Sequence, residues 1–366
     1  MAPNLIVALI TAPRFRRYLL VYSILLAICG FTWIEFASPR LKEHGVLLRS
    51  LDQNNKDLVG GWFGTNSKPR FPEFIHLATL DSRFLPERGE TDKISKRLVV
   101  VGDVHGCRDE LDKLLRKISF NHDAGDHLIF AGDLINKGPK SVEVIQAARM
   151  YNSSCVRGNN EDRILLYRQE LDHRGGLSFV NPKTNIGLPN DELGGITEGE
   201  SLENEILPFG KHQEHVIARD LSEEDAAWLH KCPVVLKVGH IKGMGEVVVV
   251  HGGLAPGVPL ENQDPYSVMT MRTLDLDTHA PSSSSDGMSW AKVFNKYQSL
   301  YTSSTSGTSK PEPTTVIYGH TPHKSPALLQ FTKGLDTGCV KGGKLTALVI
   351  EDGKTKIKQV RCKSYV

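Results

Sequence analysis

The sequence predicts an α/β fold in which two sheets are flanked by helices and preceded by one transmembrane helix. Three observations support this fold class. Five apolar runs each end in a short polar motif. Amphipathic segments lie between the first, second and third of these runs, and a longer apolar run lies near the N-terminus. Short apolar runs bounded by turn residues are typical of buried strands, and strands that alternate with helical segments predict a parallel sheet.

The composition is that of a globular protein. The chain has 366 residues, of which 40% are hydrophobic and 23% are charged, which is ordinary for a folded domain. The length suffices for one large domain with additions. The formal net charge of +2 gives no support to a nucleic-acid partner, and composition leaves the oligomeric state open.

The N-terminus predicts a signal anchor. Residues 18–37 form an apolar run of about the length that a helix needs to cross a bilayer. Three arginines within residues 14–17 precede the run, so residues 1–17 are expected to be a short cytosolic tail and the body to be lumenal. A cleaved signal peptide is the alternative, although Phe36-Ala37-Ser38 is a poor cleavage site. The sequon Asn152-Ser153-Ser154 agrees with a lumenal body.

The remaining chain is expected to form one main domain. Residues 38–95 contain prolines, glycines and scattered charges and are predicted to be a stalk and lead-in, with some packing around Trp62 and Phe63. Residues 96–362 are predicted to form the domain, with insertions at about 172–215 and 277–315. The second insertion contains Ser/Thr/Gly tracts, which bury too little apolar area to stay ordered.

The six cysteines are widely spaced and include no CxxC pair. Neither a structural zinc knuckle nor a dense disulfide framework is therefore expected. Cys339 and Cys362 could pair in an oxidising compartment, but the spacing favours two free thiols.

Five of the predicted strands end in a motif with a polar side chain. Residues 98–101 run into Gly102-Asp103-Val104-His105-Gly106, 128–131 into Gly132-Asp133, 155–157 into Gly158-Asn159-Asn160-Glu161, 247–250 into His251-Gly252-Gly253, and 316–318 into Gly319-His320. Helical spacing of apolar residues predicts a helix around residues 111–118 and another from Ser141. The last predicted strands are residues 345–350 and 355–360.

The side chains at these strand ends suit a pair of divalent metal ions. Asp103 and His105 lie two residues apart, so both can reach one metal from one face of a strand. Asp133 follows one βα unit later, and its carboxylate can bridge two cations. A second site is completed by Asn159, His251 and His320. Mixed oxygen and nitrogen ligands favour Zn, with Mn or Fe as alternatives, and a metal pair predicts hydrolysis.

Taken together, the five motifs resemble those of calcineurin-like metallophosphoesterases of the phosphoprotein-phosphatase type, over about residues 97–350. Asn136-Lys137, and the lack of a Ser-Ala-Pro-Asn-Tyr stretch, are unlike Ser/Thr protein phosphatases. Bacterial diadenosine tetraphosphate hydrolases are similar to this chain at Gly138-Pro139 and at residues 335–339. The strongest resemblance is to fungal vacuolar zinc-dependent endopolyphosphatases, and it lies in the anchor and in residues 156–163. The resemblance implies a two-sheet metallophosphoesterase sandwich and a vacuolar membrane location.

The same resemblance implies two ligand sets. One metal would be held by Asp103, His105 and Asp133, and the other by Asp133, Asn159, His251 and His320.

Two positions depart from the family pattern. The family motif is Gly-Asn-His-Glu, in which the His is a general acid, and Asn160 replaces that His. Asn136 stands where many members have an Asp that supports the acid. An amide does not titrate near neutral pH, and general acid catalysis contributes about 10²–10⁴-fold. The loss matters least for a phosphoanhydride, whose leaving phosphate is a weak base. His323 is a candidate replacement acid.

Cations near the motifs are candidate phosphate binders, because Arg matches phosphate oxygens as a fork and Lys acts as a point charge. They are Arg108, Lys137, Arg157, Arg163 and Arg272. Arg272 resembles the family's second phosphate-holding arginine and is assigned a catalytic role with Asn160 and Asn136. Trp290 is predicted to belong to the core.

The sequence thus predicts a membrane-anchored, dinuclear metal-dependent phosphohydrolase of phosphoanhydride bonds, with inorganic polyphosphate as the favoured substrate. A dinucleoside polyphosphate hydrolase and a Ser/Thr protein phosphatase are the alternative enzymes. A third alternative is a pseudophosphatase, a metal-binding scaffold that lost its acid at Asn160.

Overall fold

The computed structural model describes residues 13–42, 74–86, 96–173, 209–303 and 312–366. The chain divides into two units, which are described separately. Trp62, Phe63 and most of the expected insertion at 172–215 lie outside the described residues.

The first unit contains the apolar N-terminal helix. Helix α2 (Pro13–Thr32) continues through one π-helical turn (Trp33–Ala37), and the whole helix spans Pro13–Lys42. An 18-residue window of this 30-residue helix has a mean hydropathy of 2.0, and none of that window is buried. The helix is therefore long and apolar enough to cross a membrane, as the sequence predicts for residues 18–37.

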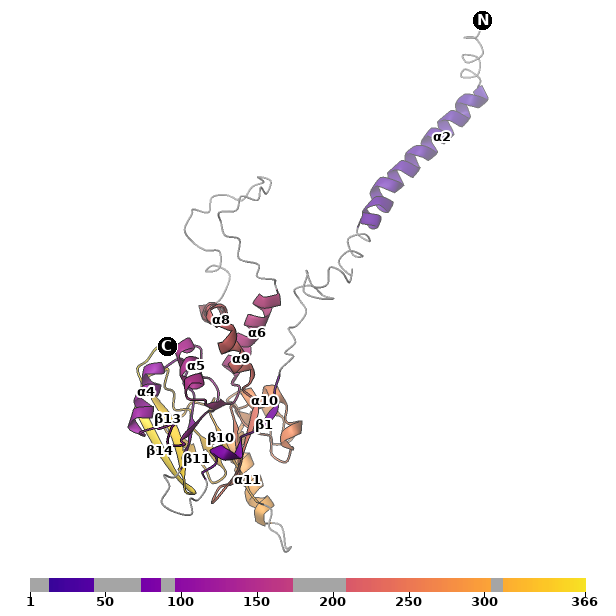
Figure 1. The fold of residues 1–366 in the computed structure, drawn as a ribbon. Coiled ribbons are helices and arrows are strands. Elements are labelled where there is room, and N and C mark those ends of the chain that lie inside the picture. Colours follow the sequence, from indigo (N-terminus) through magenta and orange to yellow (C-terminus); the bar gives the residue numbers. More distant parts are fainter. Residues whose placement is uncertain (1–12, 43–73, 87–95, 174–208, 304–311) are drawn as a thin grey trace. The chain divides into compact units, whose positions relative to one another are not determined.

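Two sheets form the centre of the second unit (Figure 1). The five-stranded sheet has the order β14 (Lys354–Arg361), β13 (Lys344–Glu351), β2 (Leu98–Val101), β3 (His127–Phe130) and β4 (Ser154–Cys155). The six-stranded sheet has the order β1 (Leu77–Thr79), β5 (Val235–Ile241), β6 (Gly245–Val250), β10 (Thr314–Tyr318), β12 (Thr332–Gly334) and β11 (Ala327–Leu328). A small third sheet orders β8 (Pro281–Ser282), β7 (Thr273–Leu274) and β9 (Met288–Ser289).

Each large sheet contains three adjacent parallel strands. Strands β2, β3 and β4 run parallel in one sheet, and β6, β10 and β12 run parallel in the other. The carboxyl ends of these strands carry the predicted motifs, so each sheet presents its polar residues along one edge.

The helices connect and cover the sheets. Helix α4 (Arg108–Lys117) connects β2 to β3 and α5 (Ser141–Met150) connects β3 to β4, as predicted. The other helices are α6 (Asn159–His173), α8 (Phe209–Asp220), α9 (Glu223–His230), α10 (Pro265–Thr270) and α11 (Trp290–Ser303), with short 3-10 turns η4 (Ser82–Phe84) and η5 (Leu260–Asn262). Acidic residues in the first turn of α4 and basic residues in its last turn complement the helix dipole.

The core lies in three layers of apolar contacts. Leu98 and Val100 of β2 face the six-stranded sheet, where they join a cluster with Val247 and Val249 of β6. The alternate residues of β2 face a second cluster that includes the buried leucines of α4, and the outer face of the six-stranded sheet packs against Trp290 and other residues of α11. The predicted two-sheet α/β fold with flanking helices is confirmed, and Trp290 is buried as predicted.

Two disulfides correct the expectation of free thiols. Cys155 pairs with Cys232, and Cys339 pairs with Cys362. The Cα atoms of each pair lie 5.1 Å and 5.2 Å apart, respectively, which is within the range that a disulfide requires. The sequence already offered Cys339–Cys362 as a possible pair, whereas spacing along the chain concealed Cys155–Cys232, whose residues are 77 apart in sequence.

Regular structure also occurs within the predicted insertion and lead-in. The predicted insertion at 277–315 contains α11, which is buried along one face under the six-stranded sheet. The serines from Ser282 to Ser285 are ordered, because Arg272 Nη1 donates to Ser283 O and Thr273 Oγ1 donates to Ser284 O. The predicted lead-in contributes β1, which pairs with β5.

Candidate active site

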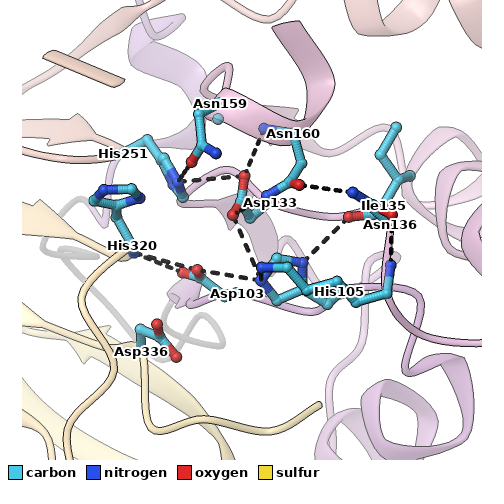
Figure 2. A network of polar contacts seen from close by, with 12 residues as sticks. Asp103, His105, Asp133, Ile135, Asn136, Asn159, Asn160, His251, His320 and Asp336 are labelled. Atoms are coloured by element: carbon cyan, nitrogen blue, oxygen red, sulfur yellow. Dashed lines mark hydrogen bonds and ion pairs between the residues drawn. The ribbon is translucent and has the colours of Figure 1, made fainter. Parts of the chain in front are cut away.

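Six polar side chains from five strand ends converge at one place (Figure 2). They are Asp103 and His105 after β2, Asp133 after β3, Asn159 after β4, His251 after β6 and His320 after β10. The carboxyl ends of parallel strands bring these residues together, as the motif order predicts.

Asp133 lies at the centre and faces two neighbours. Its Oδ2 is 3.5 Å from Nε2 of His105, whose Nε2 is also 3.8 Å from Oδ2 of Asp103. Its Oδ1 is 3.3 Å from Nε2 of His251, whose Nε2 is 3.1 Å from Oδ1 of Asn159. Asp133 is therefore shared by two overlapping groups of donor atoms.

The donor atoms within each group lie close enough to surround one cation. Those of Asp103, His105 and Asp133 lie within 4.8 Å of one another, and the same holds for Asp133, His251 and His320. All five residues are buried. Carboxylate oxygens and imidazole nitrogens in this arrangement fit transition-metal ions.

The three histidine rings are held with one nitrogen directed at this cluster. Nδ1 of His105 donates to the carbonyl of Ile135 at 3.2 Å, and Nδ1 of His251 donates to the carbonyl of Ala131 at 2.8 Å. Nε2 of His320 donates to the carbonyl of Thr270 at 2.9 Å. Metal-binding histidines use a hydrogen bond of this kind to fix the ring, so the residues present fit a metal centre.

The electrostatics of the cluster also favour cations. Burial and the charge of Asp336 raise the pKa of Asp103 well above its usual value. Burial alone would raise the pKa of Asp133, but His251, His105 and Lys137 hold it well below the usual value. Burial lowers the pKa of His251, but Asp133 outweighs this effect and raises it to about 10. Buried carboxylates are costly without a counter-charge, which a metal ion supplies.

The backbone around the cluster is strained. His105, Asp133, Asn136, Lys137 and His320 all have φ between 47° and 74°. Non-glycine residues rarely adopt this left-handed region, and such strain gathers at functional sites.

Glu161 holds the Asp133 loop in place. Its carboxylate accepts hydrogen bonds from the backbone N–H groups of Asp133, Leu134, Ile135 and Gly158, at 2.8 to 3.2 Å. A Cβ on Gly158 would collide with the Asp133 carboxylate, so only glycine permits this approach. The third motif contained Glu161, but its supporting role became visible only in the structure.

Asn160 contacts Asp133 and does not line the pocket. Its Nδ2 donates to Oδ2 of Asp133, and its Oδ1 accepts from Asn136 Nδ2 at 2.8 Å and from Arg163 Nη2 at 2.7 Å. Asn136 Nδ2 also donates to Glu214 Oε1, which pairs with Arg163 at 3.1 Å. Asn160 and Asn136 thus form a buried network that positions the Asp133 carboxylate.

A cavity of about 120 Å³ opens over the cluster. It is lined by His105, Asp133, Lys137, Asn159, Arg272, His320, Pro322, Asp336, Gly338, Val340 and Lys341. Lys137 Nζ lies 3.0 Å from Nε2 of His105, and Arg272 Nη1 donates to Ser283 O. Two of the predicted phosphate binders, Lys137 and Arg272, therefore face the cavity.

The other predicted cations lie elsewhere. Arg157 is fully buried, where its guanidinium contacts the carbonyl of His230 and the ring of Phe74. Arg108 pairs with Asp112 on α4 and donates to the carbonyl of Glu143. Neither is placed to bind a phosphate in this cavity, because nearness to a motif in sequence does not set the direction of a side chain.

Arg163 and His323 are also outside the cavity lining. Arg163 contacts Asn160 and Glu214. His323 is exposed, so it is not positioned as a replacement acid.

Two charged residues of the cavity lining were not predicted from the sequence. Asp336 is buried and directed toward the cluster (Figure 2), and its Oδ1 accepts from the backbone N–H of Gly338 at 2.9 Å. Burial raises the pKa of Asp336. Lys341 lies on the turn that follows. The motif at residues 335–339 marked this region without indicating that it faces the cluster.

Comparisons with known proteins agree with this geometry. Residues 96–347 match the calcineurin-like phosphoesterase family. The bis(5'-nucleosyl)-tetraphosphatase PrpE (asymmetrical) of Bacillus subtilis is 27% identical over 265 residues, which cover 68% of this chain and 88% of the relative. The protein of the same name from Halalkalibacterium halodurans is 29% identical over 266 residues, with the same coverage of 68% and 88%.

A solved structure shows the same fold. It belongs to a protein assigned as a diadenosine tetraphosphatase, and it is 24% identical to this chain with a TM-score of 0.54. The match covers 79% of this chain and 99% of that protein.

Proposed function

The chain belongs to the calcineurin-like phosphoesterase family, and we propose that it hydrolyses the phosphoanhydride bonds of dinucleoside polyphosphates. The observation that carries this proposal is the pair of buried donor groups that share Asp133 beneath a cavity lined by cations. The tetraphosphatase relatives support the substrate class, because this chain spans 88% of their length.

The proposed metal ligands follow the two donor groups. Asp103, His105 and Asp133 would hold one divalent ion, and Asp133, Asn159, His251 and His320 would hold the other. Zn is the favoured metal for this donor set, with Mn or Fe as alternatives. When bound, two such ions act as Lewis acids on water and on a phosphoryl oxygen.

The protein side chains bind and orient the substrate. Lys137 and Arg272 face the cavity and would hold phosphate oxygens by charge-assisted hydrogen bonds. Asn160 would keep Asp133 oriented between the two metals. No proton donor is assigned to the position of Asn160, since a phosphoanhydride has a leaving group that needs little protonation.

Inorganic polyphosphate is a second candidate substrate. Among the described residues, the cavity lining contains no Phe, Tyr or Trp on which a nucleobase could stack, whereas Lys137, Arg272 and Lys341 all suit a phosphate chain. The relatives thus support a dinucleoside polyphosphate as the substrate, whereas the side chains that line the cavity support inorganic polyphosphate.

One assay separates these functions. Detergent-solubilised full-length protein, loaded with Zn or Mn, is given bis(5'-adenosyl) tetraphosphate, polyphosphate and an alkyl phosphate, and products are resolved by ion-exchange chromatography. Cleavage of the tetraphosphate is the expected result, and preferential cleavage of polyphosphate would support the second candidate. If the metal is bound but no substrate is turned over, the protein is a pseudophosphatase scaffold and the proposal is wrong.

We also propose that helix α2 anchors the protein with its N-terminus cytosolic and its catalytic domain lumenal, in the vacuole membrane. The helix is apolar enough to span a bilayer, and the two disulfides fit an oxidising compartment. Asn152, in the single sequon of the chain, is exposed in the turn between α5 and β4. When the protein is expressed in fungal cells, enzymatic removal of N-glycans should therefore increase the electrophoretic mobility of the wild type. The mobility of Asn152→Gln should not change. A wild type without a glycan would contradict the lumenal orientation.

A further inference from the structure

A glycine-rich turn places one unassigned lysine at the cavity. Residues 338–343 turn back between β12 and β13, with Lys341 N donating to Gly338 O at 3.1 Å and Gly343 N donating to Gly338 O at 2.9 Å. Gly338 and Gly342 have φ of 68° and 82°, which glycine adopts without strain. Gly338, Val340 and Lys341 of this turn all line the cavity.

The turn is fixed from behind. The Cys339–Cys362 disulfide ties it to the segment after β14, and Tyr365 N donates to Val340 O at 2.9 Å. Val340 is only 3% exposed. Because the backbone is anchored in this way, the turn can present Lys341 with little loss of entropy on binding.

Lys341 carries a charge that forms no ion pair with the described residues. Its side chain is exposed, and in the described part of the chain no carboxylate forms an ion pair with its ammonium group. Lys137 and Arg272 likewise face the cavity without a carboxylate partner among the described residues. Three cations from three separate segments thus line one opening, which is an arrangement that suits a polyanion.

The three cations differ in their distance from the reaction centre. Lys137 Nζ lies 3.0 Å from His105 Nε2, and Arg272 lies close enough to His320 for its charge to contribute to lowering the pKa of that ring. Both cations therefore border the proposed metal ligands. Lys341 has no hydrogen bond or ion pair to any of the six ligand residues in the described structure. It is therefore placed to meet a part of the substrate beyond the phosphate that reacts.

We propose that Lys341 binds the distal phosphates of a phosphoanhydride chain and sets the preference for substrates with several linked phosphates. This inference rests on the proposed function, since it assigns a role within the same cavity. On this proposal, a substrate with one phosphate would contact the metal ligands alone, whereas a tri- or tetraphosphate would also reach Lys341.

Kinetics on substrates of increasing chain length test this role. Lys341→Met, which keeps the length of the side chain without its charge, should raise KM about 10-fold for tripolyphosphate and for bis(5'-adenosyl) tetraphosphate, which corresponds to one charge-assisted hydrogen bond. The increase should be smallest for p-nitrophenyl phosphate, and Lys341→Arg should restore most of the affinity. Lys358→Met is the matched control, because Lys358 is an exposed lysine of β14 outside the cavity.

A binding measurement separates this inference from the proposed function. Tripolyphosphate is titrated calorimetrically into the metal-loaded wild type and into each variant. If the wild type binds tripolyphosphate but cleaves neither it nor bis(5'-adenosyl) tetraphosphate, the proposed function fails, while weaker binding by Lys341→Met still supports the distal site. If Lys341→Met changes KM and binding equally for all chain lengths, or changes neither, the distal site is overturned.

Discussion

The two large sheets contribute unlike halves to one cavity. The five-stranded sheet supplies Asp103, His105, Asp133 and Asn159 from three consecutive parallel strands. The six-stranded sheet and its connections supply His251, Arg272, His320, Asp336 and Lys341 from segments spread over a much longer stretch of chain.

The difference lies in what holds each half together. The first half is fixed by contacts within one βαβαβ unit, chiefly the four backbone hydrogen bonds to Glu161. The position of the second half relative to the first depends on the two sheets staying packed. Both disulfides join the sheets, since Cys155 of β4 pairs with Cys232 just before β5, and Cys339 after β12 pairs with Cys362 after β14.

The largest expected effect comes from the one residue that both donor groups share. Asp133→Asn should lower kcat/KM more than about 1,000-fold, since loss of an outer-shell partner alone costs about 10–100-fold, and should lower the bound metal measured by mass spectrometry. Asp123→Asn, at an exposed position, is the control and should behave as wild type. Full metal content in Asp133→Asn would show that the two halves bind metal independently.

The disulfides test how the halves are joined. Replacing both Cys155 and Cys232 by Ser should lower the free energy of unfolding by about 4 kcal/mol, and replacing Cys339 and Cys362 by about 3 kcal/mol. The order follows from the sequence separations of 77 and 23 residues. Urea denaturation under oxidising conditions measures both values. An unchanged midpoint in either double variant would mean that sheet packing alone holds the halves.

A substitution at Asn160, which departs from the family pattern, tests the role of the missing general acid. Asn160→His should raise activity on an alkyl phosphate by at most about 100-fold and on an anhydride by less, because general acid catalysis helps a poor leaving group most. Initial rates on the two substrates, with and without Asn136→Asp, measure the difference. A larger gain on the anhydride would contradict the leaving-group argument.

The smallest effect concerns a histidine outside the cavity. His127 of β3 bonds Ser154 of β4 at 2.9 Å and stacks on Phe84, and burial lowers its pKa to about 4. The unfolded chain binds a proton near pH 6.5 that the folded chain does not bind until about pH 4. Stability should therefore fall as pH falls through this window, by about 2 kcal/mol at pH 5. His127→Gln should remove this part of the pH dependence, as measured by urea unfolding at pH 7 and pH 5, and an unchanged dependence would contradict the assignment.

Much of the first half could be predicted from sequence. Asp103, His105 and Asp133 occur where buried strands end, and consecutive parallel strands of one βαβ unit must place such ends together. The prediction extended to His251 and His320 because their motifs also follow apolar runs.

Other assignments failed because they depend on the direction of a side chain. Arg157 precedes Gly158 in a motif, yet its guanidinium is buried against His230 and Phe74. The motif gave Asn160 its place in the acid position, but its hydrogen bond to Asp133 became visible only in the structure.

The sequence by itself determined the fold class and the six candidate ligands, because strand-end motifs combine local turn chemistry with a ligand type. Only the tertiary structure decided that Asp336 and Lys341 line the cavity and that Cys155 meets Cys232. These contacts join segments from different sheets, and they depend on how the sheets pack, which no local pattern in the chain records.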